Sequence, residues 1–170
     1  MEWLLIALLI AADQVSKALI SSNPSAYANI EVIRDFFYIT YVKNTGAAWS
    51  MMAGQRALLS VIAAVAIGVM LLYMQKAKRK KEHLTVFALA LMAAGAAGNL
   101  IDRLLLGYVR DFLNFYIFGY DFPVFNVADI CLCVGVGLLI LATILEKEDP
   151  EADVVIPEVI APKKDRTGVD

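Results

Sequence analysis

Long apolar runs, separated by shorter polar stretches, dominate the pattern of this chain of 170 residues. Each of four runs is close to the roughly 20 residues that an α-helix needs to cross a hydrocarbon core of about 30 Å. The pattern predicts transmembrane helices at about residues 3–20, 57–74, 84–101 and 127–145. Residues 1–145 are therefore expected to form one four-helix membrane domain.

The composition agrees with this pattern. The chain is 60% hydrophobic with a mean hydropathy of +0.66, which is typical of a small multi-pass membrane protein. A net charge of −2 gives no broad basic footprint for nucleic acid. Residues 146–170 differ from the rest, because they are polar and contain three prolines and charges of both signs. We expect this segment to be a disordered cytoplasmic tail.

Charge along the chain predicts the orientation of the helices. Residues 75–83 link the second and third apolar runs and contain five basic side chains. Short basic loops face the cytoplasm, so this link and both termini are expected there. The connections at about 21–56 and 102–126 are then expected at the outer face. In the first of them, Phe36–Val42 is predicted to be a strand, with Ile30–Ile33 as a partner strand.

The second outer connection is rich in aromatic residues, and its sequence leaves two interpretations open. Aromatic side chains at this depth commonly form an interfacial belt. The alternative is a wall or lid for an apolar substrate that enters from the lipid. The residues concerned are Phe115, Tyr116, Phe118, Tyr120 and Phe122.

Two aspartates stand at the predicted outer ends of the helices. Asp111 follows the third apolar run and Asp129 opens the fourth. An ionisable side chain in a membrane segment costs roughly 2.5–3.5 kcal/mol on insertion scales, so it indicates a function or a partner. Two such carboxylates at one depth are expected to share a proton. That state suits aspartic peptidase chemistry, which needs neither a metal nor a cofactor.

Further polar residues lie close to these aspartates along the predicted helices. Asp13 and Lys17 are four residues apart and form either an ion pair with Lys17 reaching the interface, or a support with Asp13 turned inward. Asn126 shares a helix face with Asp129. At the end of the third run, Asn99 and Asp102 share a face, and Arg103 is expected to pair with Asp102 or with an outer phosphate or carbonyl.

Other chemistries fit the sequence poorly. His83 is the single histidine and lies in the basic link, so a histidine-based triad or a histidine-rich metal site at the outer face is excluded. HExxH and GxGD motifs are absent. A proton-coupled transporter would place its carboxylates nearer the membrane centre. A non-enzymatic scaffold would leave Asp111 and Asp129 without a basic partner.

Taken together, the motifs resemble those of the bacterial lipoprotein signal peptidases, also called signal peptidase II. Their order and spacing carry the resemblance over about residues 3–145. The matching segments are residues 13–17 (DQVSK), 44–48 (NTGAA), 98–103 (GNLIDR), 109–112 (VRDF) and 125–129 (FNVAD). Arg110 and Ile130 are departures, since a Val and a Ser are common at these positions, which leaves fine substrate preference open.

The resemblance implies an all-α membrane protein of four transmembrane helices with a small extracytoplasmic β-sheet cradle in the bacterial cytoplasmic membrane. It implies cleavage of diacylglyceryl-modified prolipoproteins just before the lipidated cysteine, and inhibition by globomycin-type cyclic peptides. It also implies that Asp111 and Asp129 are the catalytic pair. Residues implied to line the site are Asn44, Asn99, Arg103 and Asn126, and supporting residues are Asp13, Lys17, Gly46 and Asp102.

Overall fold

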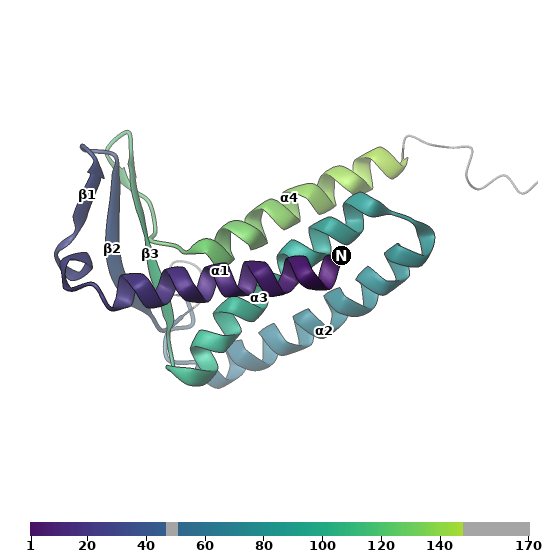
Figure 1. Ribbon diagram of the computed structural model, residues 1–170, viewed down its shortest axis with the longest axis horizontal. Helices are drawn as coiled ribbons and strands as arrows, with labels where there is room; N and C mark the ends of the chain where they lie inside the picture. The colour runs from purple at the N-terminus through teal and green to yellow at the C-terminus, as the bar shows by residue number, and fades with distance from the viewer. Residues whose placement is uncertain (47–50, 148–170) are drawn as a thin grey trace, which may run out of the picture.

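Four long helices run side by side, and a small β-sheet stands at one end of them (Figure 1). The computed structural model describes residues 1–46 and 51–147; the predicted tail and residues 47–50 lie outside this part of the chain. All four helices are long and apolar enough to cross a membrane, which confirms the four predicted spans. They are α1 (Glu2–Ser21), α2 (Arg56–Lys80), α3 (His83–Leu105) and α4 (Val127–Lys147).

The predicted basic loop at residues 75–83 is mostly helical, so its predicted boundaries were wrong. Lysine and arginine are good helix formers, and positive charge in a last turn is favourable next to the free carbonyl groups of a helix end. α2 therefore continues to Lys80, and Lys81 ends it with a left-handed φ of 64°. Similarly, α3 continues to Leu105, which puts Asp102 and Arg103 inside the helix.

Helix α3 lies at the centre of the bundle and carries most of its buried residues. Glycines allow its neighbours to approach closely. A Cβ atom added to Gly95 would lie 2.3 Å from the Ala128 carbonyl oxygen, and one added to Gly98 would lie 2.5 Å from Asp13 Oδ2. The small residues therefore bring the polar parts of α1, α3 and α4 into direct contact at the end near the sheet. The outer faces of α1, α2 and α4 expose large apolar side chains, as expected for lipid contact.

The sheet is antiparallel, with the strand order β1-β2-β3-β4. Its strands are β1 (Ile30–Ile33), β2 (Phe37–Asn44), β3 (Val109–Ile117) and β4 (Tyr120–Asp121). The two predicted strands are confirmed as β1 and β2. β3 was not predicted, because its polar residues obscure the alternating pattern, and it is held by pairing with β2, which lies far away in the sequence.

The aromatic connection divides between two environments. Phe115 stacks between Phe37 and Phe125, with ring centroids 4.5 Å and 5.7 Å away. Phe118 lies at the turn between β3 and β4 and is fully exposed. The stacked rings of Phe37, Phe115 and Phe125 stiffen the sheet, whereas the turn exposes the apolar side chain of Phe118.

Candidate active site

Asp111 lies on β3 opposite Val42 of β2. Its side chain is buried. Two amide groups donate hydrogen bonds to its carboxylate: Asn44 Nδ2 lies 2.9 Å from Oδ2 and Asn126 Nδ2 lies 2.6 Å from Oδ1. Asn44 is itself fixed, since its Oδ1 accepts a hydrogen bond from the Gly46 N–H at 2.9 Å.

Asp129 lies in the first turn of α4 and is held by a reciprocal helix cap. The Asn126 N–H donates to Asp129 Oδ2 at 3.1 Å, and the Asp129 N–H donates to Asn126 Oδ1 at 3.0 Å. This is the capping-box arrangement, with residue N3 supplying the carboxylate. Asn99 Nδ2, from α3, donates to Asp129 Oδ1 at 2.8 Å.

Asn126 therefore contacts both carboxylates, one through its side-chain amide and the other through its backbone N–H. A short bridge positions it: Phe125 exchanges backbone hydrogen bonds with Leu113, at 2.8 Å and 3.1 Å. Leu113 is two residues after Asp111, and Phe125 directly precedes Asn126. The strand and the helix start are thus held in register, and both aspartates of the predicted pair come to one place.

Burial raises the pKa of the Asp111 carboxyl from its ordinary value of 3.8 to about 6. The hydrogen bonds from Asn44 and Asn126 oppose this shift, because they favour the ionised form, while the charge of Asp129 adds to it. The influence of Asp129 indicates that the two carboxylates interact electrostatically.

The predicted Asp13–Lys17 pair is formed, with Lys17 Nζ 2.9 Å from Asp13 Oδ2. The expectation that Lys17 reaches the interface is wrong, because its side chain is fully buried. It also donates to Asn99 Oδ1 at 2.8 Å. Asp13 turns inward, and its Oδ1 accepts a hydrogen bond from the Ala128 N–H at 2.9 Å. Both residues therefore support groups that hold Asp129.

Asp102 pairs with Arg110 and not with Arg103, so this one of the two alternatives for Arg103 is wrong. Arg110 Nη2 lies 2.7 Å from Asp102 Oδ1, and both its backbone N–H and its Nε donate to Oδ2. Consecutive residues on a helix point about 100° apart, so Arg103 faces another way. Its Nη2 donates to the Gly46 carbonyl oxygen at 2.9 Å, which holds the turn that follows β2.

Sequence reasoning missed the roles of Arg110 and Gln14. Gln14 donates to Asp102 Oδ1 at 3.2 Å and to the Gly98 carbonyl oxygen at 3.0 Å, and it accepts from Arg110 Nη2 at 3.0 Å. These contacts fasten β3 to α1 and α3, one residue before Asp111. The signal in the sequence that could have indicated the role of Arg110 is its position directly before a candidate catalytic aspartate. Ile130, the other departure, is largely exposed on α4.

Known proteins share this arrangement over almost the whole described chain. The family model for signal peptidase (SPase) II matches residues 5–145. A lipoprotein signal peptidase from Symbiobacterium thermophilum is 45% identical over 136 residues, which are 80% of this chain and 89% of the relative. The chain belongs to the signal peptidase II family. It is thus a multi-pass membrane peptidase of a family that removes signal peptides from prolipoproteins, which displaces the transporter and scaffold interpretations.

Solved structures agree with this assignment to signal peptidase II. A bacterial membrane enzyme determined by the in meso method at 2.3 Å has a TM-score of 0.81 and 35% identity, covering 91% of this chain and 93% of that chain. A second, determined by the same method at 1.9 Å, has a TM-score of 0.73 and 37% identity, covering 84% and 91%. The four-helix fold with its small sheet is therefore the fold of known membrane enzymes.

Proposed function

We propose that this signal peptidase II member is an aspartic endopeptidase in which Asp111 and Asp129 form the catalytic pair. The observation that carries this proposal is the bridging of two membrane-level carboxylates by Asn126, one of them with its pKa raised to about 6. The substrate is a prolipoprotein carrying a diacylglyceryl cysteine. The scissile peptide bond is the one just before that cysteine.

The pair performs hydrolysis by exchanging protons with the water molecule and the substrate. The ionised carboxylate removes a proton from a water molecule as the water oxygen attacks the scissile carbonyl carbon, and the protonated partner donates to the carbonyl oxygen. In the second step the carboxyl that took the water proton donates it to the cysteine nitrogen, the other carboxylate takes a proton back from a hydroxyl of the tetrahedral intermediate, and the carbon–nitrogen bond breaks to release the amine. The products are a carboxylic acid and the new amino terminus, so atoms and charges balance without a metal ion or cofactor.

Around the pair, the proposed division of roles follows the contacts. Asn44, Asn99 and Asn126 orient the carboxylates. Gly46 gives Arg103 its backbone acceptor. Three buried charged residues hold the asparagines and Asp129 in place, which is the supporting role that the resemblance implies for them. They are Asp13, Lys17 and Asp102.

The proposed orientation places this site at the outer face of the cytoplasmic membrane and both termini in the cytoplasm. Its support is the basic end of α2, with Lys78, Arg79 and Lys80 in the last turn, at the end of the bundle opposite the sheet (Figure 1). Basic residues beside membrane spans are retained on the cytoplasmic side. The sheet and the carboxylates then face outward, where a translocated signal peptide ends.

A cleavage assay tests the proposal directly. The purified protein is incubated in lipid with a prolipoprotein that carries the diacylglyceryl group, and the product is sequenced by mass spectrometry. We expect the lipid-bearing cysteine as the new amino terminus, no loss of rate with EDTA, and inhibition by a globomycin-type cyclic peptide. The same prolipoprotein without the lipid serves as the control substrate. Rapid loss of activity with EDTA, or cleavage at another bond, would contradict the proposed chemistry.

The pH dependence of kcat/KM follows from the raised pKa of Asp111. The pair needs one proton, and burial raises the pKa of this carboxyl to about 6, so kcat/KM should fall as pH rises above that value. Asn44→Ala removes a hydrogen bond that favours the ionised form, so the pKa rises and the falling limb moves to higher pH. Gln55→Ala, at an exposed amide outside the site, is the matched control. If the fall of kcat/KM occurs at the same pH in Asn44→Ala, Asn44 does not influence the pKa of the carboxylate pair.

A further inference from the structure

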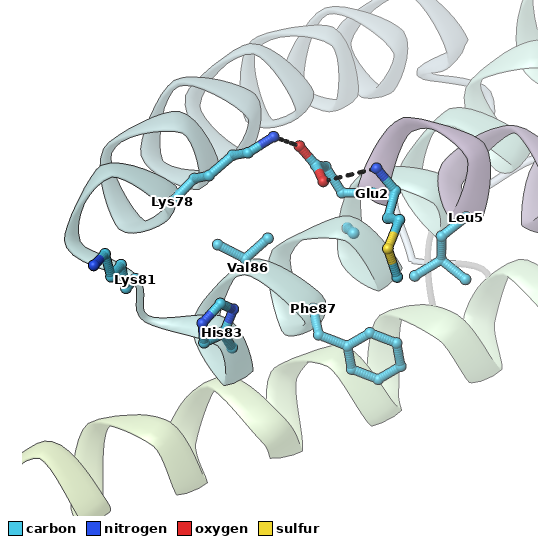
Figure 2. A pocket seen from close by; sticks show the side chains of 9 residues that line it. Glu2, Leu5, Lys78, Lys81, His83, Val86 and Phe87 are labelled. Atoms are coloured by element: carbon cyan, nitrogen blue, oxygen red, sulfur yellow. Dashed lines mark hydrogen bonds and ion pairs between the residues drawn. The ribbon is translucent and has the colours of Figure 1, made fainter.

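A concave site lies at the end of the bundle far from the sheet, where α1 begins and where α2 passes into α3. It is a half-open cavity of about 500 Å³, which lies in the range of small-molecule sites. Its apolar lining comes from Leu5 of α1 and from Val86, Phe87 and Ala90 of α3. Figure 2 shows Val86 and Phe87 beside the charged residues that complete the lining.

The charged part of the cavity is predominantly basic. Glu2, its one acidic residue, forms ion pairs with Lys78 and with the amino group of Met1, so its charge is compensated locally (Figure 2). Lys81 and His83 also line the cavity, and within residues 1–46 and 51–147 their side chains make no hydrogen bond or ion pair. Two exposed donors therefore stand next to an apolar surface.

Helix length places this cavity at the level of lipid headgroups. The 25 residues of α2 span about 37 Å at 1.5 Å per residue, which is longer than a hydrocarbon core of about 30 Å. The last turn of α2 and the residues that follow it then extend into the headgroup layer. Phe87, one helical turn beyond His83, is 45% exposed. The cavity thus has a basic rim at headgroup depth and an apolar floor below it.

We propose that this cavity binds one anionic phospholipid of the inner leaflet. The phosphate lies between Lys81 and His83, and one acyl chain lies along Leu5, Val86 and Phe87. Charge and depth favour this occupant, because an anionic phospholipid carries a negative group and an apolar chain at the spacing that a basic pocket between membrane helices offers. The site is separate from the carboxylate pair. The assignment of the bound lipid to the inner leaflet rests on the proposed orientation of the protein. The affinity of the site for lipid does not depend on catalysis.

Lipid binding to the intact protein tests the proposal. The protein in a non-ionic detergent is titrated with phosphatidylglycerol or with zwitterionic phosphatidylcholine, and bound lipid is counted by native mass spectrometry. The key variant is Lys81→Asn, because asparagine tolerates the left-handed φ of 64° found there. Lys76→Gln removes the same charge from an exposed position on α2 outside the cavity and is the matched control. Val86→Phe fills the apolar floor.

We expect one phosphatidylglycerol to bind in preference to phosphatidylcholine. Lys81→Asn should weaken it roughly fivefold, as expected for one basic residue near a lipid charge, and Lys76→Gln should leave it unchanged. Val86→Phe should weaken both lipids. Equal affinity for the two lipids, or equal weakening by Lys76→Gln, would overturn the proposal by showing unspecific or diffuse attraction. The cleavage rate of Lys81→Asn, measured in parallel, should equal that of the unaltered protein and separates this site from the peptidase proposal.

Discussion

Asp111→Asn and Asp129→Asn are each expected to lower the cleavage rate by about 10³-fold or more, because each removes one partner of the acid–base pair. Asparagine keeps the size of the side chain and can neither take up nor release the required proton. The hydrogen bonds that hold the neighbouring helix and strand are largely retained, so the variants should remain folded. Cleavage of the lipidated prolipoprotein, followed by product formation over time, measures the effect.

The control for this experiment is Asp121→Asn, which removes an exposed carboxylate from β4 of the same sheet. It should cleave at the rate of the unaltered protein. Thermal unfolding in detergent shows whether each variant is folded. Full activity in a folded Asp111→Asn or Asp129→Asn protein would remove that residue from the catalytic pair.

Lys17→Met is expected to destabilise the protein by about 3–5 kcal/mol, since it leaves the buried Asp13 carboxylate without a positive partner. Lys17 is fully buried and lies 2.9 Å from Asp13 Oδ2 and 3.7 Å from Asp102 Oδ2. It also holds the Asn99 amide that contacts Asp129, so the cleavage rate should fall as well. Chemical unfolding in detergent measures the first effect and the prolipoprotein assay the second.

A charge-balanced double variant separates loss of charge from loss of packing. Asp13→Asn combined with Lys17→Met removes one charge of each sign, and the double variant should regain part of the stability lost in Lys17→Met. Lys76→Met, at an exposed position on α2, should change the free energy of unfolding little. If the double variant is less stable by the sum of the single changes, the two side chains do not act as a pair.

The helices were predictable because their apolar runs match the thickness of a membrane, and the first two strands because β-branched and aromatic residues cluster in them. β3 was not, since Arg110, Asp111 and Asn114 make it look like a polar connection. Its stability comes from pairing with β2, which no local pattern reveals. The end of α2 was also misplaced, because charge was taken as evidence for a loop although lysine and arginine continue a helix well.

The two candidate catalytic residues were predicted, but the supporting contacts were predicted only in part. The sequence offered Asp102 as one possible partner of Arg103, whereas the fold brings Arg110 from the neighbouring strand to Asp102. The sequence left open whether Lys17 reaches the interface or Asp13 turns inward as a support; the fold buries Lys17, and two carboxylates and an amide compensate its burial. The pairing of Lys17 with Asp13 was visible in the local sequence, but Asn99 and Asp102 come from α3 and Arg110 from β3, so local sequence contains no signal for those contacts.

Because Asn126 belongs both to the helix cap of α4 and to the site, the site stays assembled only while the first turn of that helix is formed. This residue caps α4 and also contacts both carboxylates, so opening the first turn of α4 disperses the pair in the same event. Helix ends are commonly the first parts of a protein to open. The bridge between Phe125 and Leu113 ties this particular end to the sheet. The opening free energy of that single turn therefore sets an upper limit on the fraction of molecules in which the two carboxylates are assembled between substrates.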